Sequence, residues 1–350
     1  MSTINTERFQ FSGKGSEYFR IWIVNLALTL LTLGIYSAWA KVRRLQYFYR
    51  HTSLAGSSFD YHGDPKAILK GRIIAVVLLI AYNVAGNLNP IWGLVALGVL
   101  LLVLPWLIQR SLQFKLHNSS YRGLRFSFGG STGQAYKNFL LWPLAGYASL
   151  GLLMPLVHQR IKAYQHGSSR YGTENFLFSG RPGQFYNIYL KLLGLILVLL
   201  IVLAGGIAIG MYGLSGIFSG ELDSKSNKQI VGIVVIVLVF YLLALLLIGP
   251  WFSARTQNLV WNHTALGENP MQSNVRARGL FAIYLTNFIA IILTLGLFKP
   301  FADIRLARYR LEHLAMHPQR SLDEISAAQA RATTATGEES ADLFDFDISF

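Results

Sequence analysis

Two histidines come nearest to forming a reactive site in this sequence. His313 and His317 stand four residues apart in "HLAMH", a spacing that places two imidazoles on one face of a helix. A zinc enzyme built on such a helix also carries a glutamate as base, in the pattern H-E-x-x-H. Here the residue after the first histidine is Leu314, and Pro318 follows directly. We therefore predict no metal site.

The other common catalytic patterns are missing. The chain has no cysteine, which excludes disulfides, thiolate catalysis and Cys-ligated metals. "GGSTG" at 129–133 and "GRPG" at 180–183 lack the Lys-Ser/Thr of a phosphate-binding loop and are typical of turns. No G-x-S-x-G motif occurs, and no paired carboxylates suit acid–base work. The sequence predicts neither an enzyme nor a bound cofactor.

A few polar residues inside apolar stretches are the remaining candidates. Asn25 and Asn287 each lie 18 residues before an arginine, Arg43 or Arg305, in two similar stretches of sequence. Polar groups at membrane depth often mark a substrate or ion path. We predict a shared polar locus there, made of Asn25, Thr32, Asn287 and Thr294. The alternative is ordinary hydrogen bonding between helices, which contributes about 1 kcal/mol or less per pair.

These candidates lie in long apolar segments. Of 350 residues, 53% are hydrophobic and only 14% are charged. A helix needs about 20 apolar residues to cross the hydrocarbon layer. Seven segments approach that length: 19–40, 70–87, 91–109, 138–157, 186–212, 230–251 and 279–300. The sequence predicts a multi-pass membrane protein.

The segments end in a recurring pattern. "TLGIYSAWAKVRRLQY" at 32–47 is matched by "TLGLFKPFADIRLARY" at 294–309. Aligned in this way, five arginines occupy equivalent positions, with a proline or alanine five residues before each. They are Arg43, Arg110, Arg160, Arg255 and Arg305. We interpret the pattern as internal duplication, and we expect these arginines to anchor the topology or contact anionic headgroups.

A short aromatic motif follows three of these arginines, and a fourth copy precedes the first apolar segment. "FQFSG", "FDYHG", "FSFGG" and "FLFSG" share the form F-x-[FY]-x-G, which favours a short strand followed by a turn. Their aromatic residues are Phe9, Phe11, Phe59, Tyr61, Phe126, Phe128, Phe176 and Phe178. Met271 and Ser321 stand at the corresponding positions of two further copies. We predict that the motifs meet in one small sheet beside the membrane, as opposed to four unrelated hairpin tips.

The distribution of positive charge bears on orientation. All but two of the Lys and Arg residues before residue 321 lie in six regions: 1–20, 41–72, 110–137, 158–191, 252–278 and 299–320. If all seven segments crossed, region 41–72 would lie outside, against the positive-inside tendency. If segments 1, 4 and 7 enter and leave on one side, all six regions are cytoplasmic. We favour this second arrangement; the rival is an inverted-repeat carrier.

Charge also limits the partners. The net charge of +14 is explained by basic inner loops, with no nucleic-acid-binding motif. We predict the lipid bilayer as partner, with anionic phospholipid headgroups near the basic loops; protein partners stay unknown. Residues 321–350 are acidic and rich in Ala, Ser and Thr, typical of a disordered tail. An alternative is that "LFDFDISF" folds back onto the sheet or the basic loops.

The opening stretch carries a family resemblance. "FQFSGKGSEYFR", followed by "TLGIYSAWAKVRR", resembles the YjgN-like family of bacterial inner-membrane proteins, over about residues 7–315. The resemblance implies an integral inner-membrane protein without established activity, cofactor or ligand. It supplies no catalytic residues.

Together these features predict an all-α polytopic membrane protein: an internally duplicated helical bundle with a small cytoplasmic cap of short strands and loops. We divide it into a polar segment with one strand (1–18), two membrane repeats (19–135 and 136–278), a seventh segment with a basic helix (279–320) and the tail (321–350). The expected function is transport or lipid handling, with a non-catalytic membrane scaffold as the alternative. A carrier should show a polar cavity reaching mid-membrane, lined by Asn25 and Asn287.

Overall fold

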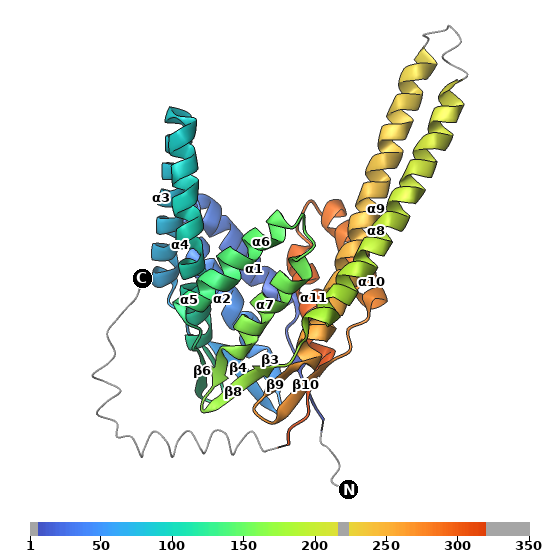
Figure 1. Cartoon of the computed structure of the whole chain (residues 1–350). Helices are drawn as coiled ribbons and strands as arrows, with labels where there is room; N and C mark the ends of the chain where they lie inside the picture. Colours follow the sequence, from blue (N-terminus) through green and yellow to red (C-terminus); the bar gives the residue numbers. More distant parts are fainter. Residues whose placement is uncertain (1–5, 216–223, 320–350) are drawn as a thin grey trace, which may run out of the picture.

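The computed structural model of the protein describes residues 6–215 and 224–319. Five pairs of helices stand on one sheet, and the pairs α3–α4 and α8–α9 reach farther from the sheet than the other three (Figure 1). The helices are α1 (Gly15–Leu31), α2 (Ser37–Arg50), α3 (Pro65–Leu88), α4 (Pro90–His117), α5 (Thr132–Tyr136), the π-helical η1 (Lys137–Leu141), α6 (Trp142–Ala148), α7 (Met154–Gly167), α8 (Pro182–Ser215), α9 (Ser224–Asn262), α10 (Ala277–Leu293) and α11 (Lys299–Glu312).

Eleven short strands form a single antiparallel sheet in the order β1-β11-β10-β9-β8-β7-β6-β5-β4-β3-β2. They are β1 (Glu7–Arg8), β2 (Gln10–Phe11), β3 (Thr52–Leu54), β4 (Ser57–Tyr61), β5 (Ser119–Tyr121), β6 (Leu124–Phe128), β7 (Ser169–Tyr171), β8 (Glu174–Phe178), β9 (Thr264–Leu266), β10 (Asn269–Ser273) and β11 (Leu314–Met316). The two ends of the order, β1 and β2, are joined in the chain through Phe9 alone. The sheet therefore curves round on itself into a near-barrel.

Tight turns set the register of this sheet. Four hairpins, β3–β4, β5–β6, β7–β8 and β9–β10, each have two residues between their strands. Gly56, Gly123, Gly172 and Gly267 occupy these turns with positive φ. Two-residue turns with positive φ match the twist of paired strands, and glycine adopts that conformation without steric cost.

The prediction of an all-α bundle with a small cap is wrong. The strands involve both ends of the described chain and link all five helix pairs. Each helix pair, together with the strands that follow it, is called a unit below. The fourth unit (α8–α9) has Met271 and no aromatic pair, yet it supplies β9 and β10, and the fifth unit (α10–α11) supplies β11. The register of these strands depends on backbone pairing and on a turn that contains glycine. Neither feature can be recognised from the aromatic motif. The four aromatic motifs themselves lie in or directly beside strands.

The glycine that ends each aromatic motif has a steric role. A Cβ placed on Gly13, Gly63, Gly130 or Gly180 would lie 2.7, 2.6, 2.6 or 2.5 Å from the ring of the aromatic residue two positions earlier. Those rings belong to Phe11, Tyr61, Phe128 and Phe178. Each ring covers the chain at the corner between a strand and the following helix, so only glycine fits there.

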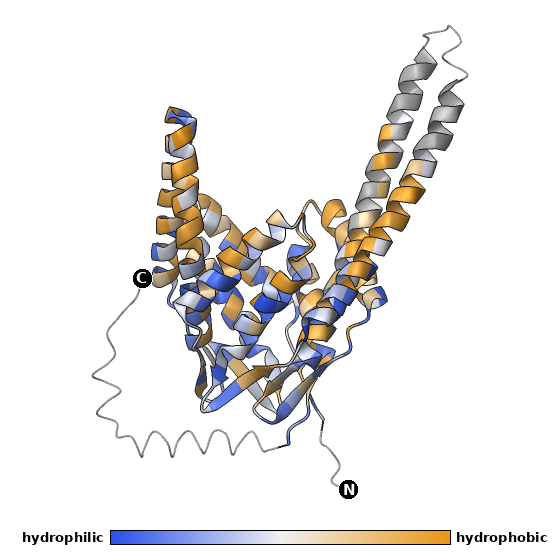
Figure 2. Ribbon diagram, in the orientation of Figure 1, coloured by the Kyte–Doolittle hydropathy of each residue, from blue (hydrophilic) through white to orange (hydrophobic). Residues whose placement is uncertain are grey.

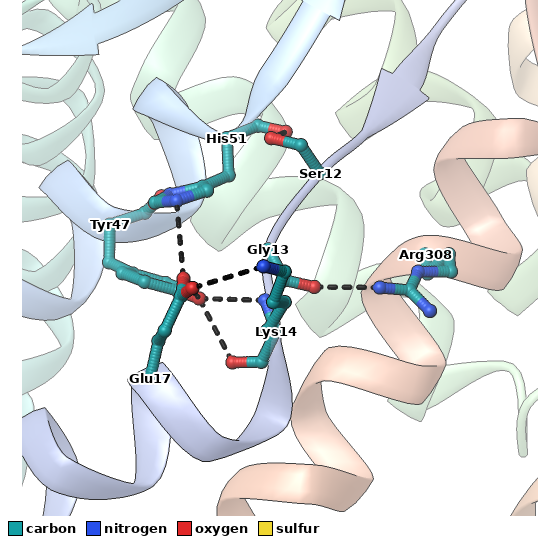
Figure 3. Close-up of polar contacts among 7 residues, drawn as sticks. All are labelled: Ser12, Gly13, Lys14, Glu17, Tyr47, His51 and Arg308. Atoms are coloured by element: carbon teal, nitrogen blue, oxygen red, sulfur yellow. Dashed lines mark hydrogen bonds and ion pairs between the residues drawn. The ribbon is translucent and has the colours of Figure 1, made fainter.

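Side chains from the helices hold the carbonyls of these corners. Gln109 Nε2 donates to Gly130 O at 2.8 Å, and Gln159 Nε2 donates to Gly180 O at 2.9 Å. At the first corner, Arg308 of α11 donates to Gly13 O at 2.7 Å (Figure 3). That bond ties the last described helix to the corner between β2 and α1.

Tyr47 of α2 clamps the same corner from the other side (Figure 3). Its hydroxyl accepts from Lys14 N at 2.8 Å and donates to Lys14 O at 3.0 Å. Tyr164 and Tyr309, at equivalent positions of α7 and α11, donate to Ser131 O and Arg276 O, both at 3.2 Å. Each tyrosine thereby fixes the second helix of a pair to the corner before the first.

Three of the seven apolar segments are not continuous helices. Segments 19–40, 138–157 and 279–300 are each broken by a turn, at Leu33–Gly34, Leu150–Gly151 and Leu295–Gly296, where both residues have positive φ. The predicted segments 70–87, 91–109, 186–212 and 230–251 lie within α3, α4, α8 and α9. Among the described residues, Pro65–Leu88, Pro90–His117 and Pro182–Gly206 are long and apolar enough to cross a membrane. Figure 2 shows the apolar character of these helices.

Caps define the pair α3–α4. Asp64 accepts from Lys66 N at 2.9 Å before Pro65, and Asn89 accepts from Ile91 N at 2.8 Å before Pro90. Proline at the first helical position has no N–H that would need a partner. Asn89 thus ends α3 and begins α4 in a single residue, which makes this turn very tight.

Candidate functional site

The near-barrel lines a cavity of about 590 Å³, called the chamber below. The strands form its wall, and the last turns of five helices (α2, α4, α7, α9 and α11) border it on the side of the helix pairs. The volume falls in the range of roughly 300–1,000 Å³ that is usual for small-molecule sites. The chamber is the strongest candidate for a ligand site.

Equivalent positions of the five units line the chamber as three sets of residues. The rim comes from the residue six positions after each of the five arginines: Tyr49, Leu116, His166, Trp261 and Leu311. The wall is Phe9, Phe59, Phe126, Phe176 and Met271. The third set, called the floor below, is Leu54, Tyr121, Tyr171, Leu266 and Met316, and four of its members pair directly with wall residues on neighbouring strands. Nearly all of these side chains are apolar or aromatic, so the chamber favours an apolar ligand.

The wall is a continuous series of aromatic rings. Phe9 and Phe59 stack with their centroids 6.0 Å apart, and the pairs Phe59–Phe126 and Phe126–Phe176 follow at 6.4 Å each. These are the first aromatic residues of the four predicted motifs. The second aromatic residues, Phe11, Tyr61, Phe128 and Phe178, cover the corner glycines instead. The structure thus divides the predicted aromatics into two groups with different roles.

The floor contains two tyrosines that sequence reasoning missed. Tyr171 OH donates to Tyr121 O at 2.9 Å, and Tyr121 OH donates to Leu54 O at 2.7 Å. Both tyrosines are almost fully buried. The only signal in the sequence is the match of "SSY" at 119–121 with "SRY" at 169–171. These bonds join neighbouring hairpins across the floor of the chamber.

Four hydroxyl groups at the first residues of strands already form hydrogen bonds to the backbone. Thr52, Ser119 and Ser169 each donate to the carbonyl four residues earlier at 2.7 Å, and Thr264 does so at 2.8 Å. They satisfy the last carbonyls of α2, α4, α7 and α9, which have no partner within the helix. The chamber is therefore less polar than its composition indicates.

His166 is the titratable group best placed to affect the chamber. Its ring meets Trp261 edge-on at 5.3 Å, and its Nδ1 lies 3.4 Å from Thr264 Oγ1. Burial, and secondarily the charge of Lys162, lowers the pKa of His166 to about 4. At neutral pH the rim therefore carries a neutral imidazole.

Positive charge gathers beside the chamber. Lys115 of α4 lines it and lies near enough to Lys41 of α2 and Lys162 of α7 for their charges to interact. Burial, and then the charge of Lys115, lowers the pKa of Lys162. In the described parts of the chain, none of these three lysines pairs with an acid. An anionic group here would relieve the mutual repulsion.

The five predicted arginines lie outside the chamber and are all exposed. Each stands nine residues before the first residue of a strand, so they form one level above the sheet, called the arginine belt below. Arg43, Arg110 and Arg160 lie over the rings of Tyr36, Trp106 and Trp142 at 5.6–5.8 Å. Positive and aromatic side chains at one level are typical of a membrane interface.

The predicted polar locus is divided between two hairpins. Asn287 accepts from Arg305 at 2.8 Å and belongs to α10–α11. Asn25 is buried in α1 beside a shallow depression that also involves Lys41, Arg72 and Asp303, and its Oδ1 has no hydrogen-bond partner among the described residues.

Thr32 and Thr294 lie in the turns that break segments 1 and 7, where both hydroxyls bond to backbone groups. In the structure, Thr32 and Thr294 therefore each contact the backbone of their own turn. The chamber itself is apolar and at the level of the sheet, unlike the polar mid-membrane cavity by which we expected to recognise a carrier.

The two histidines of "HLAMH" are not on one helix face. α11 ends at Glu312, and β11 separates His313 from His317. His313 Nδ1 lies 2.8 Å from Tyr309 O, whereas His317 contacts Thr6 and Gln272. Within residues 6–215 and 224–319, no group of three His, Asp or Glu side chains is placed to hold a metal.

Comparison with known proteins gives a family and named relatives. A family model described as "Bacterial protein of unknown function (DUF898)" matches residues 6–343. The inner membrane protein YjgN of Salmonella typhimurium strain LT2 is 30% identical over 127 residues, which are 36% of this chain and 32% of that protein.

The protein of the same name from Escherichia coli strain K12 is 30% identical over 135 residues, covering 37% of this chain and 32% of the relative. The matched region thus spans about a third of the length of these relatives. No solved structure matches.

Proposed function

The chain belongs to the DUF898 family of bacterial proteins, and from that premise we propose that it is a lipid-handling or transport module of the inner membrane. Its site is the chamber, and its ligand is an amphipathic molecule with an apolar tail and an anionic head. Its similarity to inner-membrane proteins and its three apolar helices support an integral membrane protein. The observation that carries the proposal is an aromatic cavity of about 590 Å³ with Lys115 in its lining.

Physical chemistry favours this class of ligand. An apolar tail gains roughly 25 cal/mol for each Å² it removes from water, and the aromatic wall offers such a surface without unsatisfied hydroxyls. Lys115, two residues before the end of α4, supplies positive charge in the chamber lining, and the charge of Lys162 of α7 lies close enough to interact with it. A carboxylate or phosphate there would be bound by charge-assisted hydrogen bonds. The chemistry is that of binding, and we propose no catalytic step.

We also propose that the sheet and the basic loops face the cytoplasm. All five helices that carry the arginine belt end on the same sheet, so the basic regions near them lie at one end of the molecule. The positive-inside tendency places such an end in the cytoplasm.

The test uses two probes with one tail and different heads. The purified full-length protein in detergent is titrated with a pyrene-labelled fatty acid and with the corresponding uncharged alcohol. Leu116→Trp, which adds bulk at the rim of the chamber, should weaken both probes at least tenfold. Leu177→Trp is the matched control, because Leu177 is exposed on β8 outside the chamber.

The role of charge has its own variant pair. Lys115→Gln should weaken the acid on the order of fivefold, equivalent to ~1 kcal/mol, and leave the alcohol unchanged. Lys66→Gln, at a corner away from the chamber lining, should affect neither probe. Equal binding of both probes to Leu116→Trp and to the unmodified chain would refute the chamber as the site. A non-catalytic scaffold would then be the better interpretation.

A further inference from the structure

Three helix pairs share an unusual tip. In α1–α2, α6–α7 and α10–α11, called the short hairpins below, a Thr or Ser is followed by Leu and Gly. The leucines Leu33, Leu150 and Leu295 have φ of 49°, 53° and 51°, and the glycines that follow have φ of 94°, 88° and 94°. A left-handed leucine is uncommon. Its recurrence at all three tips indicates that they share one type of turn.

The backbone of this turn is satisfied internally. Gly34, Gly151 and Gly296 donate to the carbonyl five residues earlier at 2.8, 2.9 and 2.7 Å, which ends the first helix in a Schellman motif. The hydroxyls of Thr32, Ser149 and Thr294 then accept the N–H four residues later, at 2.9, 3.0 and 3.0 Å. They also donate back to carbonyls of the first helix. Such a turn meets the requirement for non-helical backbone within a bilayer.

The side chains at the tips fit hydrocarbon, not water. Leu33, Leu150 and Leu295 are 95%, 94% and 95% exposed, and their neighbours Leu31, Leu152 and Leu293 are also largely exposed. An exposed apolar cluster of this kind marks a surface that binds something apolar. Every tip points away from the sheet, on the same side as the long pairs α3–α4 and α8–α9 (Figure 1).

Chain length gives the depth. Each tip leucine lies ten residues before the arginine of its own hairpin, a distance of at most about 15 Å at the helical rise. The α3–α4 turn at Asn89 lies twenty-one residues before Arg110, about 30 Å. The hydrocarbon layer is about 30 Å thick. With the arginine belt at the headgroups, α3–α4 spans the whole layer and each short hairpin spans half.

From these observations we infer that the three short hairpins enter only the leaflet on the sheet side and end near the middle of the bilayer, while α3–α4 crosses it. The partner of their tips is the hydrocarbon of that bilayer. The arginine belt, with Tyr36, Trp106 and Trp142 beneath three of its members, fixes the depth at the interface. Lipid of the opposite leaflet lies directly above the short hairpins, so the protein displaces more lipid from one leaflet than from the other.

Single-cysteine variants test this inference, since the chain has no native cysteine. The variants are Leu33→Cys, Leu150→Cys, Leu295→Cys, Asn89→Cys and Ser58→Cys, each in the full-length chain in native membranes. A membrane-impermeant maleimide should label Asn89→Cys and Ser58→Cys from opposite sides. The three leucine variants should label from neither side and only after denaturation.

Depth quenching separates hydrocarbon from burial inside protein. Each leucine variant, labelled with a fluorophore and reconstituted, should be quenched more strongly by lipid carrying a nitroxide near the chain end than near the headgroup. Labelling of the leucine variants from the Asn89 side would show that the hairpins cross. Labelling from the Ser58 side, or stronger quenching at the headgroup, would show that they lie on the surface. A tip quenched by neither lipid would show burial in protein, and each of these three results overturns the inference.

Discussion

Single residues at the helix ends are used in the same way in unit after unit. His51, His263 and His313 each place Nδ1 2.7–2.8 Å from the carbonyl four residues earlier, and Asn118 uses its side-chain amide for the same purpose at 2.9 Å. These polar residues close helices just before a strand begins. Their function is local, which explains why the histidines of this chain do not gather into a reactive site.

His166 gives a prediction at this scale. Because its pKa in the folded protein is about 4, against an ordinary value of 6.5, the unfolded chain takes up a proton first as pH falls. The free energy of unfolding should therefore decrease between about pH 6.5 and 4, by at most ~1.4 kcal/mol per unit, and be unaffected above pH 7. Thermal unfolding in detergent across this range, for the native chain and for His166→Gln, measures the difference. The prediction fails if the two profiles are parallel.

At the scale of elements, the left-handed glycines of the short hairpins can be tested against helical ones. Gly34 has φ of 94°, and no atom lies within 4 Å of the position that a Cβ would take, so Gly34→Ala costs only backbone strain, about 1–2 kcal/mol. Gly98, inside α4, has the same open surroundings but helical backbone. Gly98→Ala should stabilise by up to about 1 kcal/mol. Opposite shifts in melting temperature are expected, and a loss of stability in both variants would contradict this account.

Much of the element order could be read from the sequence, and its failures have physical causes. The aromatic motifs located strands, and charge distribution suggested that segments 1, 4 and 7 differ from the rest. The favoured arrangement requires a break in each of these segments, but hydropathy does not mark its position, because apolar composition is continuous through Leu33, Leu150 and Leu295. Their signal was present in "TLG", "SLG" and "TLG", where a hydroxyl residue and a glycine surround an apolar one. Hydropathy cannot detect a turn whose side chains are themselves apolar.

The candidate site was harder to predict than the elements. Phe9, Phe59, Phe126 and Phe176 were named among eight motif aromatics, but nothing in their spacing showed that these four line a cavity. That property comes from closing the sheet, which depends on pairing between residues about 300 positions apart, such as Glu7 with Met316. Asn25 and Asn287 were chosen because they occupy equivalent positions in two similar stretches of sequence. In a ring of units, equivalent residues belong to different units, so the match in sequence does not bring them side by side.

Closure of the ring is a property of the whole molecule, and it rests on the first strand. β1 pairs with β11, β2 pairs with β3, and Phe9 and Phe11 are buried between them. Deleting residues 2–13 should therefore leave β3 and β11 as unpaired edges and open the chamber. The measured result should be a lower melting temperature in detergent and new protease cleavage within the strand hairpins.

A deletion at the C-terminal end distinguishes the effect of opening the sheet from the effect of shortening the chain. Removing residues 321–350 shortens the chain by more residues than the N-terminal deletion and removes none of the eleven described strands. This variant should keep the native melting temperature and protease resistance. Phe9→Ala provides a graded intermediate, expected to cost about 3–5 kcal/mol as a buried aromatic truncation. If the N-terminal deletion proved as stable as the tail deletion, the sheet would not need its first strand, and closure could not be what maintains the chamber.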